Sequence, residues 1–140
     1  MKSSSDILSW TDQAISTWTD NGIKLQPRLP REVITTFEAQ LGFEFPEDFR
    51  ELYQRVNGFE DFDWNTHMFS LWSLDRILKE YQEGDDDNYV GFCDYLINSH
   101  SIGFFKSEEG VYKSYSQIEP IAKTFREAID LINTNSDLLY

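Results

Sequence analysis

The sequence has very few of the side chains that enzymes use for covalent or acid–base chemistry. Its 140 residues include one cysteine, Cys93, and two histidines, His67 and His100. A single thiol cannot form an internal disulfide, which fits the reducing cytoplasm. The chain also lacks Cys-x-x-Cys, His-Glu-x-x-His, phosphate-loop and glycine-rich dinucleotide motifs. We therefore expect a protein that is not an enzyme and that has no catalytic residues, cofactor or bound metal.

Positive charge is also scarce. Twelve lysines and arginines oppose 25 acidic residues, so the formal charge is −13 and the pI is near 4.4. Such a field repels phosphate backbones and anionic lipid, and no basic patch offsets it, so we expect no direct binding to nucleic acid or membranes. The same field favours a basic protein partner, although acidity can also serve solubility alone.

Long apolar runs are absent as well. No run approaches the roughly 20 residues that a membrane span requires. The polar residues that follow Met1 do not form the apolar core of a signal peptide. We therefore expect a cytoplasmic protein.

Aromatic residues, in contrast, are abundant. They make up 16% of the chain, which predicts a core built on bulky rings. Apolar periodicity predicts helices within residues 5–20, 30–41, 46–56, 74–81 and 119–133, and strands at residues 68–72, 89–96, 101–106 and 111–115. This order predicts an α+β fold with N-terminal helices, a central antiparallel sheet of about four strands and a C-terminal helix packed on the sheet. The length suits one domain, residues 1–140.

The clearest element is the helix predicted after residue 45. Pro46 fits the first helical position, because its missing amide hydrogen would be unpaired there. Asn57 and Gly58 tolerate the left-handed turn that ends many helices. Between them, four apolar side chains recur at i, i+3, i+4 and i+7 and predict a buried stripe: Phe49, Leu52, Tyr53 and Val56.

This segment also resembles a known family. A helix opened by Leu29-Pro30, followed by Phe-Pro-x-x-Phe-x-x-x-Tyr and then Asn57-Gly58, resembles the SUKH superfamily. Later segments extend the similarity in the expected order to about residue 132: residues 91–95, a strand, a hairpin and Ile121-Ala122-x-x-Phe125. The superfamily contains fungal cell-wall-synthesis regulators and many bacterial toxin-immunity proteins. The resemblance therefore implies one SUKH-like domain that binds other proteins.

Three groups of residues could be interpreted as reactive or ligand-binding sites. Cys93 with His100 could be a thiol nucleophile and its base, but a lone cysteine is more often an inert core residue. Residues 85–88 are rich in oxygen ligands, yet they lack the spacing and closing glutamate of a calcium loop. Glu60 and Asp63 could suggest a glycosidase pair, but nothing in the sequence would make one carboxyl group the acid and the other the base. We expect a structural Cys93 and a solvated acidic loop.

Acidic residues are concentrated in one part of the chain. Residues 59–109 carry nine of the thirteen net negative charges. Three aromatic residues alternate with acids at the start of this part, and such rings either anchor a partner or fold onto the core: Phe59, Phe62 and Trp64. We expect Trp72 in the core. The candidate partner-binding residues are Glu60, Asp61, Asp63, Trp64, Asp85, Asp86 and Asp87.

For a single-domain bacterial member, the resemblance implies an immunity protein. Such a protein would bind and neutralise a cognate toxin of the polymorphic or contact-dependent type by occlusion. The acidic field favours a basic toxin, which suggests a nuclease. The alternative is a non-enzymatic regulatory interaction module of the cell-wall-regulator type. Both leave the oligomeric state open.

Overall fold

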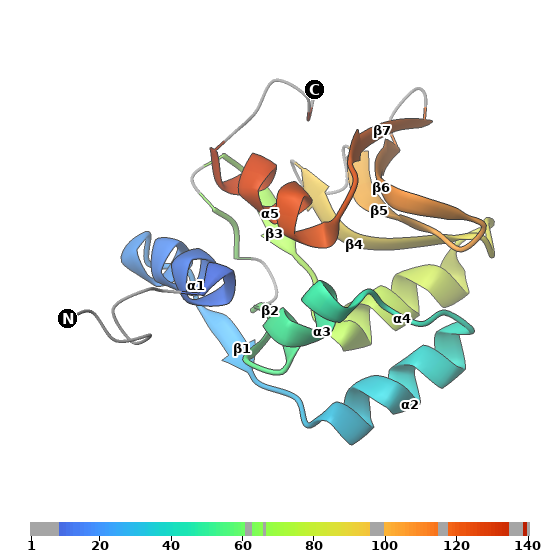
Figure 1. Ribbon diagram of the computed structural model, residues 1–140, viewed down its shortest axis with the longest axis horizontal. Helices are drawn as coiled ribbons and strands as arrows, with labels where there is room; N and C mark the ends of the chain where they lie inside the picture. The colour runs from blue at the N-terminus through green and yellow to red at the C-terminus, as the bar shows by residue number, and fades with distance from the viewer. Residues whose placement is uncertain are drawn as a thin grey trace.

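The chain combines helices with antiparallel strands in the computed structural model, which describes residues 9–60, 63–65, 67–95, 100–114, 118–134 and 139. The helices within these residues are α1 (Trp10–Asp20), α2 (Arg31–Leu41), α3 (Glu47–Tyr53), α4 (Leu74–Glu83) and α5 (Phe125–Thr134) (Figure 1). The strands are β1 (Leu25–Pro27), β2 (Val56–Phe59), β3 (Phe69–Leu71), β4 (Tyr89–Tyr95), β5 (His100–Phe105), β6 (Glu108–Ser114) and β7 (Ile118–Ala122). This mixture confirms the predicted α+β class.

The main sheet has five strands in the order β3-β4-β5-β6-β7, and every neighbouring pair is antiparallel. Strands β1 and β2 form a separate two-stranded sheet. Strand β7 was missed by the sequence analysis, which placed residues 119–122 in the last helix. Pro120 lies on this edge strand, where a missing amide hydrogen breaks no ladder to a further strand. Ile121 therefore reaches the core from a strand.

An aromatic core lies between the sheet and the helices α3 and α5, which cover one face of it (Figure 1). The Phe125 ring centroid lies 5.0 Å from those of Phe49 and Phe92, and Phe92 lies 5.0 Å from Phe104. Phe49, Leu52 and Tyr53 of the predicted helical stripe are buried in α3, whereas Val56, although also buried, lies in β2. Aromatic rings from α3, the main sheet and α5 therefore pack against one another in one cluster.

Helix α3 is shorter than predicted. Pro46 stands just before it as the N-cap residue, and the helix ends at Tyr53. Asn57 and Gly58 belong to β2, so the prediction that they end the helix was wrong. They permit a close chain crossing instead: a Cβ at Gly58, whose φ is 71°, would lie 2.4 Å from the Trp72 carbonyl oxygen. The Asn57 side-chain oxygen accepts a hydrogen bond from the first amide of α4, that of Leu74, at 2.9 Å.

Helix caps agree with the sequence in part. Ser73 caps α4, directly before the helix predicted at residue 74, and its hydroxyl accepts a hydrogen bond from the Arg76 amide at 3.2 Å. Helix α1 is capped by Ser9 in a reciprocal capping box with Asp12. The helix was predicted from residue 5, and residues 5–8 lie outside the described part of the chain. The β5–β6 turn is Lys106–Ser107, because β6 begins at Glu108 instead of at the predicted residue 111.

Candidate functional site

The first predicted partner-binding segment follows β2. Glu60 is exposed, whereas Asp63 and Trp64 are half-buried. An Asp63 carboxylate oxygen accepts a hydrogen bond from the Lys24 amide at 2.5 Å, so this acid holds its own loop against the start of β1. Asp61 lies outside the described residues.

Of the three aromatic residues that could anchor a partner, one is in the core. Phe59 is 2% exposed and packs edge-on against Trp18 with a centroid distance of 5.1 Å. Phe62 lies outside the described residues, so Trp64 is the described residue of this segment that can still serve as an anchor. Trp72, which was not a candidate anchor, is 4% exposed and in the core, as expected.

The second predicted segment, Asp85 to Asp87, is exposed in the loop between α4 and β4. Asn88 ties this loop to the β5–β6 turn. Its side chain donates to the Ser107 hydroxyl at 2.9 Å and accepts from the Ser107 amide at 3.0 Å, and its carbonyl accepts from the Lys106 amide at 2.8 Å. The two predicted segments lie at opposite ends of the molecule (Figure 1). The fold therefore does not bring them together into one patch.

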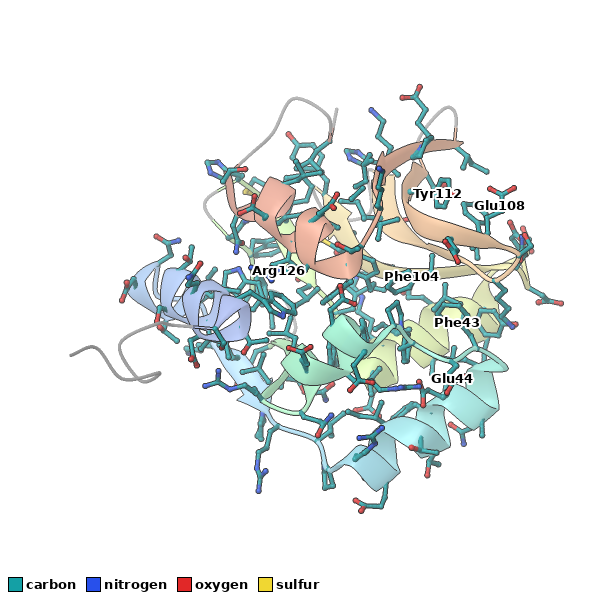
Figure 2. The ribbon with its side chains drawn as sticks, viewed as in Figure 1. Phe43, Glu44, Phe104, Glu108, Tyr112 and Arg126 are labelled. Carbon is teal, nitrogen blue, oxygen red and sulfur yellow. The ribbon has the colours of Figure 1, made fainter. Side chains whose placement is uncertain are left out.

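A groove of about 610 Å³ lies beside the same turn, between it and the α2–α3 link. Figure 2 shows Phe43 and Glu44 on one side, Glu108 and Tyr112 on the other, and Phe104 between them. We call this feature the acidic groove. Its floor and lip are aromatic: Phe43, Phe104, Phe105 and Phe125. Its walls carry acidic residues, Glu44, Glu47 and Asp48 on the side of α3 and Glu108 and Glu109 on the side of the hairpin.

Two lysines also line the groove, and one of them is engaged elsewhere. The Lys106 ammonium donates to the Leu41 carbonyl at 2.5 Å and to the Tyr81 hydroxyl at 2.6 Å, so its charge supports the C-terminal end of α2. Lys123 is exposed at the other end of the groove. Five carboxylates against two ammonium groups leave the walls of the groove negatively charged.

Arg50 organises the acids of one wall. Its guanidinium pairs with Glu38 at 3.0 Å, with Glu44 at 3.0 Å and with Glu47 at 3.2 Å. Burial alone would lower the pKa of Arg50, but the hydrogen bonds that its guanidinium donates to Glu38 and Glu44 outweigh burial and raise that pKa. One cation shared by three carboxylates leaves a net negative charge here. The Glu44 and Glu47 side chains remain 83% and 62% exposed, so a partner can still reach them.

Hydrogen bonds also hold two further acidic side chains of the walls, Asp48 and Glu108. Asp48 accepts one from the Arg126 amide at the start of α5, at 2.9 Å. The single hydroxyl hydrogen of Tyr112 is shared between a Glu108 carboxylate oxygen at 3.1 Å and the Glu109 backbone carbonyl at 2.8 Å. The walls are therefore fixed to α5 and to the hairpin.

Two further cavities lie elsewhere on the molecule. One, of about 370 Å³, lies between the end of α4 and the sheet and includes Asp85, Asp86 and Tyr89 in its lining. The other, of about 420 Å³, lies between α1 and α5. Within the part of the chain that the structure describes, no group of three His, Cys, Asp or Glu residues could hold a metal ion.

The residues that could suggest thiol chemistry are in the interior. Cys93 is 0% exposed, and burial raises the pKa of its thiol well above the usual value, which opposes formation of a thiolate. Burial lowers the pKa of His100. Asp94, one of the acids in the acidic stretch of residues 59–109, is 1% exposed. It accepts a hydrogen bond from the Trp72 indole at 2.6 Å and lies 3.6 Å from the Arg76 guanidinium. These residues support the fold.

Sequence reasoning missed the groove. Glu47 and Asp48 fell in the helix predicted at residues 46–56, and Glu108 and Glu109 were counted only within the acidic stretch of residues 59–109. The sequence signal for one wall of the groove was the alternation of Phe43, Glu44 and Phe45. The opposite wall comes from a hairpin more than 60 residues later in the sequence.

Two comparisons with known proteins bear on identity. A search of curated proteins finds no match. The sequence profile of the SMI1 / KNR4 family (SUKH-1) matches residues 29–131, a range that includes every residue of the acidic groove. This family supports a toxin-immunity protein or a regulatory protein–protein interaction module. In the described residues, no helix is both long and apolar enough to cross a membrane. Because the match covers most of its length, the chain belongs to the SMI1 / KNR4 family (SUKH-1).

Proposed function

We propose that this protein is an immunity protein that binds a cognate basic toxin of the nuclease type and neutralises it by occlusion. The supporting observation is that the acidic groove and the exposed loop of Asp85 to Asp87 flank one hairpin turn, to which Asn88 ties the loop. A nuclease must attract phosphate, so it presents a basic surface around its active site. An acidic surface complements that region and can cover it.

The mechanism requires binding alone. The exposed carboxylates steer the toxin during diffusion and raise the association rate. Contacts in the groove then retain the complex and block access of nucleic acid to the toxin. We further propose that residues 1–140 act as one domain in the cytoplasm, where the lone, buried Cys93 needs no oxidising compartment.

The first test is direct capture. The full chain, purified with a tag, is mixed with the product of the adjacent gene. We expect it to retain that protein and to abolish its nuclease activity at stoichiometric ratios. A neighbour that is neither bound nor inhibited would contradict the proposal and favour a regulatory module.

Charge reversal of the loop tests steering. We expect the triple variant Asp85→Lys, Asp86→Lys, Asp87→Lys to associate with the toxin about 10- to 100-fold more slowly at low salt, because the loop then repels a basic surface. Stopped-flow association at about 20 mM and about 150 mM salt measures the rate, and the difference should shrink at the higher concentration.

A matched control makes the same change of charge elsewhere. Asp20, Asp130 and Glu32 are exposed and lie outside the groove, so their replacement by lysine should slow association much less. Equal rates for both triple variants would show that only net charge matters. An unchanged rate for the loop variant would overturn steering by this loop.

Replacing Cys93 tests binding against catalysis. We expect Cys93→Ala to inhibit the toxin as well as the wild type does, because the thiol is buried and its raised pKa opposes reactivity. The small cavity should lower the free energy of unfolding by about 1 kcal/mol. Inhibition titration and urea denaturation measure the two effects. Lost inhibition at unchanged stability would instead indicate a catalytic thiol.

A further inference from the structure

We propose that the acidic groove is the docking site for an extended basic segment of the toxin, in which one bulky apolar side chain seats beside Phe43 and is flanked by lysine or arginine. This inference rests on the proposed function for the identity of the partner. It assigns retention of the toxin to the groove and long-range steering to the loop of Asp85 to Asp87.

The shape of the groove supports an apolar anchor. Its volume of about 610 Å³ falls in the range of sites that enclose a compact ligand or a few side chains. Phe43 is half-buried at the lip, with its ring 5.5 Å from Phe104 and 5.6 Å from Phe45. A bulky side chain placed here would cover the exposed part of Phe43 and gain aromatic contacts, as central anchors of interfaces do.

The charges of the groove select the residues on both sides of that anchor. One wall carries the carboxylates of Glu44 and Glu47, from the α2–α3 link and the start of α3. The other carries those of Glu108 and Glu109, from the hairpin. Lys106, in the β5–β6 turn, already donates hydrogen bonds to Leu41 and Tyr81. A segment with cations on both sides of its anchor can therefore pair with both walls, whereas an acidic segment would be repelled.

Both walls are already in place in the unbound protein. Arg50 orders Glu44 and Glu47, and the Tyr112 hydroxyl bonds to Glu108. Asn88 fixes the turn from its other side. A preformed groove loses little conformational entropy on binding, so a short segment can dock with useful affinity.

Probe peptides test the groove without the toxin. The basic–aromatic probe is a blocked pentapeptide with a central tryptophan between two pairs of arginine and lysine. One control peptide has glycine in place of tryptophan, and another has glutamate in place of every basic residue. We expect saturable amide shifts in the NMR spectrum of the full chain at Lys106, Gly110 and Thr124, with a Kd of about 0.1–1 mM. Both control peptides should bind at least about fivefold more weakly.

Variants then separate the contributions of the lip and the walls. Phe43→Ser should weaken the basic–aromatic probe about fivefold, and Glu108→Lys with Glu109→Lys about tenfold. Glu32→Lys with Asp130→Lys makes the same change of charge away from the groove, so this variant should bind the probe nearly as the wild type does. The amide spectrum of each variant shows that it is folded.

The outcomes distinguish this inference from the proposed function. Shifts that do not saturate, or equal binding of the tryptophan and glycine peptides, would overturn the groove as a docking site even if the toxin is captured. Failure of the wild type to capture the toxin would overturn the proposed function, whatever the peptides do. With the toxin, Phe43→Ser should raise the dissociation rate about fivefold and leave the association rate nearly unchanged; the opposite pattern would contradict retention by the groove.

Discussion

Replacing Gly58 by alanine is expected to lower the free energy of unfolding by about 2–4 kcal/mol. A methyl group at this position would lie 2.4 Å from the Trp72 carbonyl oxygen and 2.8 Å from the Ser73 nitrogen. These are backbone atoms, so the overlap can be relieved only if β2 and the chain entering α4 move apart. The φ of 71° adds strain for any residue with a side chain.

Gly22→Ala is the matched control. Its φ of 77° is nearly the same, but no atom lies within 4 Å of the added methyl group. We therefore expect only the conformational cost of about 1 kcal/mol. Urea denaturation of both variants isolates the effect of the overlap. Equal losses would show that the chain crossing at Gly58 is not tight in solution.

Replacing Phe49 by alanine is expected to lower the free energy of unfolding by about 3–5 kcal/mol. The ring is fully buried and stacks between Phe45, at 3.9 Å, and Tyr53, at 4.1 Å. It also meets Phe125 edge-on at 5.0 Å, so its loss leaves a cavity where α3, α5 and the sheet converge. A shift of the urea midpoint with an unchanged slope measures the loss.

The same substitution at Phe43 is the comparison. That ring is half-buried at the lip of the groove, so Phe43→Ala should cost about 1 kcal/mol. Equal costs at the two positions would contradict the central place of Phe49 in the core. A small cost at Phe43 would also show that groove variants report on binding rather than on folding.

The sequence predicts the fold where its patterns are local. The stripe of Phe49, Leu52 and Tyr53 follows from helical spacing, and the cap at Ser73 follows from side-chain chemistry. Asn57 and Gly58 show where such reasoning stops. A glycine with positive φ suits the end of a helix and a close chain crossing equally well, and only the distant position of Trp72 decides between them.

Strand β7 illustrates the same ambiguity. Pro120 is favourable in the first turn of a helix and is also tolerated on an edge strand. Ile121 and Phe125 have helical spacing, yet one is in β7 and the other begins α5. Residues 118–122 are a strand because they pair with β6, as Glu119 does with Lys113, and the apolar spacing of this segment does not reveal that pairing.

The candidate site was harder to predict than the fold. Acidity predicted a negatively charged surface, but the acidic groove forms only when the α2–α3 link meets the β5–β6 hairpin. Asp94 shows that an acid can also be assigned wrongly to the surface. Its carboxylate is buried, where it interacts with Trp72 and Arg76. Charge can be counted from sequence, whereas its location depends on tertiary contacts.

The hydrogen bonds of Asn88 to the neighbouring turn hold the loop of Asp85 to Asp87 in place, and they do not depend on the acidic side chains of that loop. Asn88 anchors the loop to the neighbouring turn, and the Tyr81 hydroxyl binds the backbone carbonyl of Asp87 at 2.9 Å. The side chains of Asp85 and Asp87 face solvent and can be exchanged without loss of these anchors. A few substitutions in this loop could therefore redirect the protein to a different protein partner while the rest of the fold stays the same.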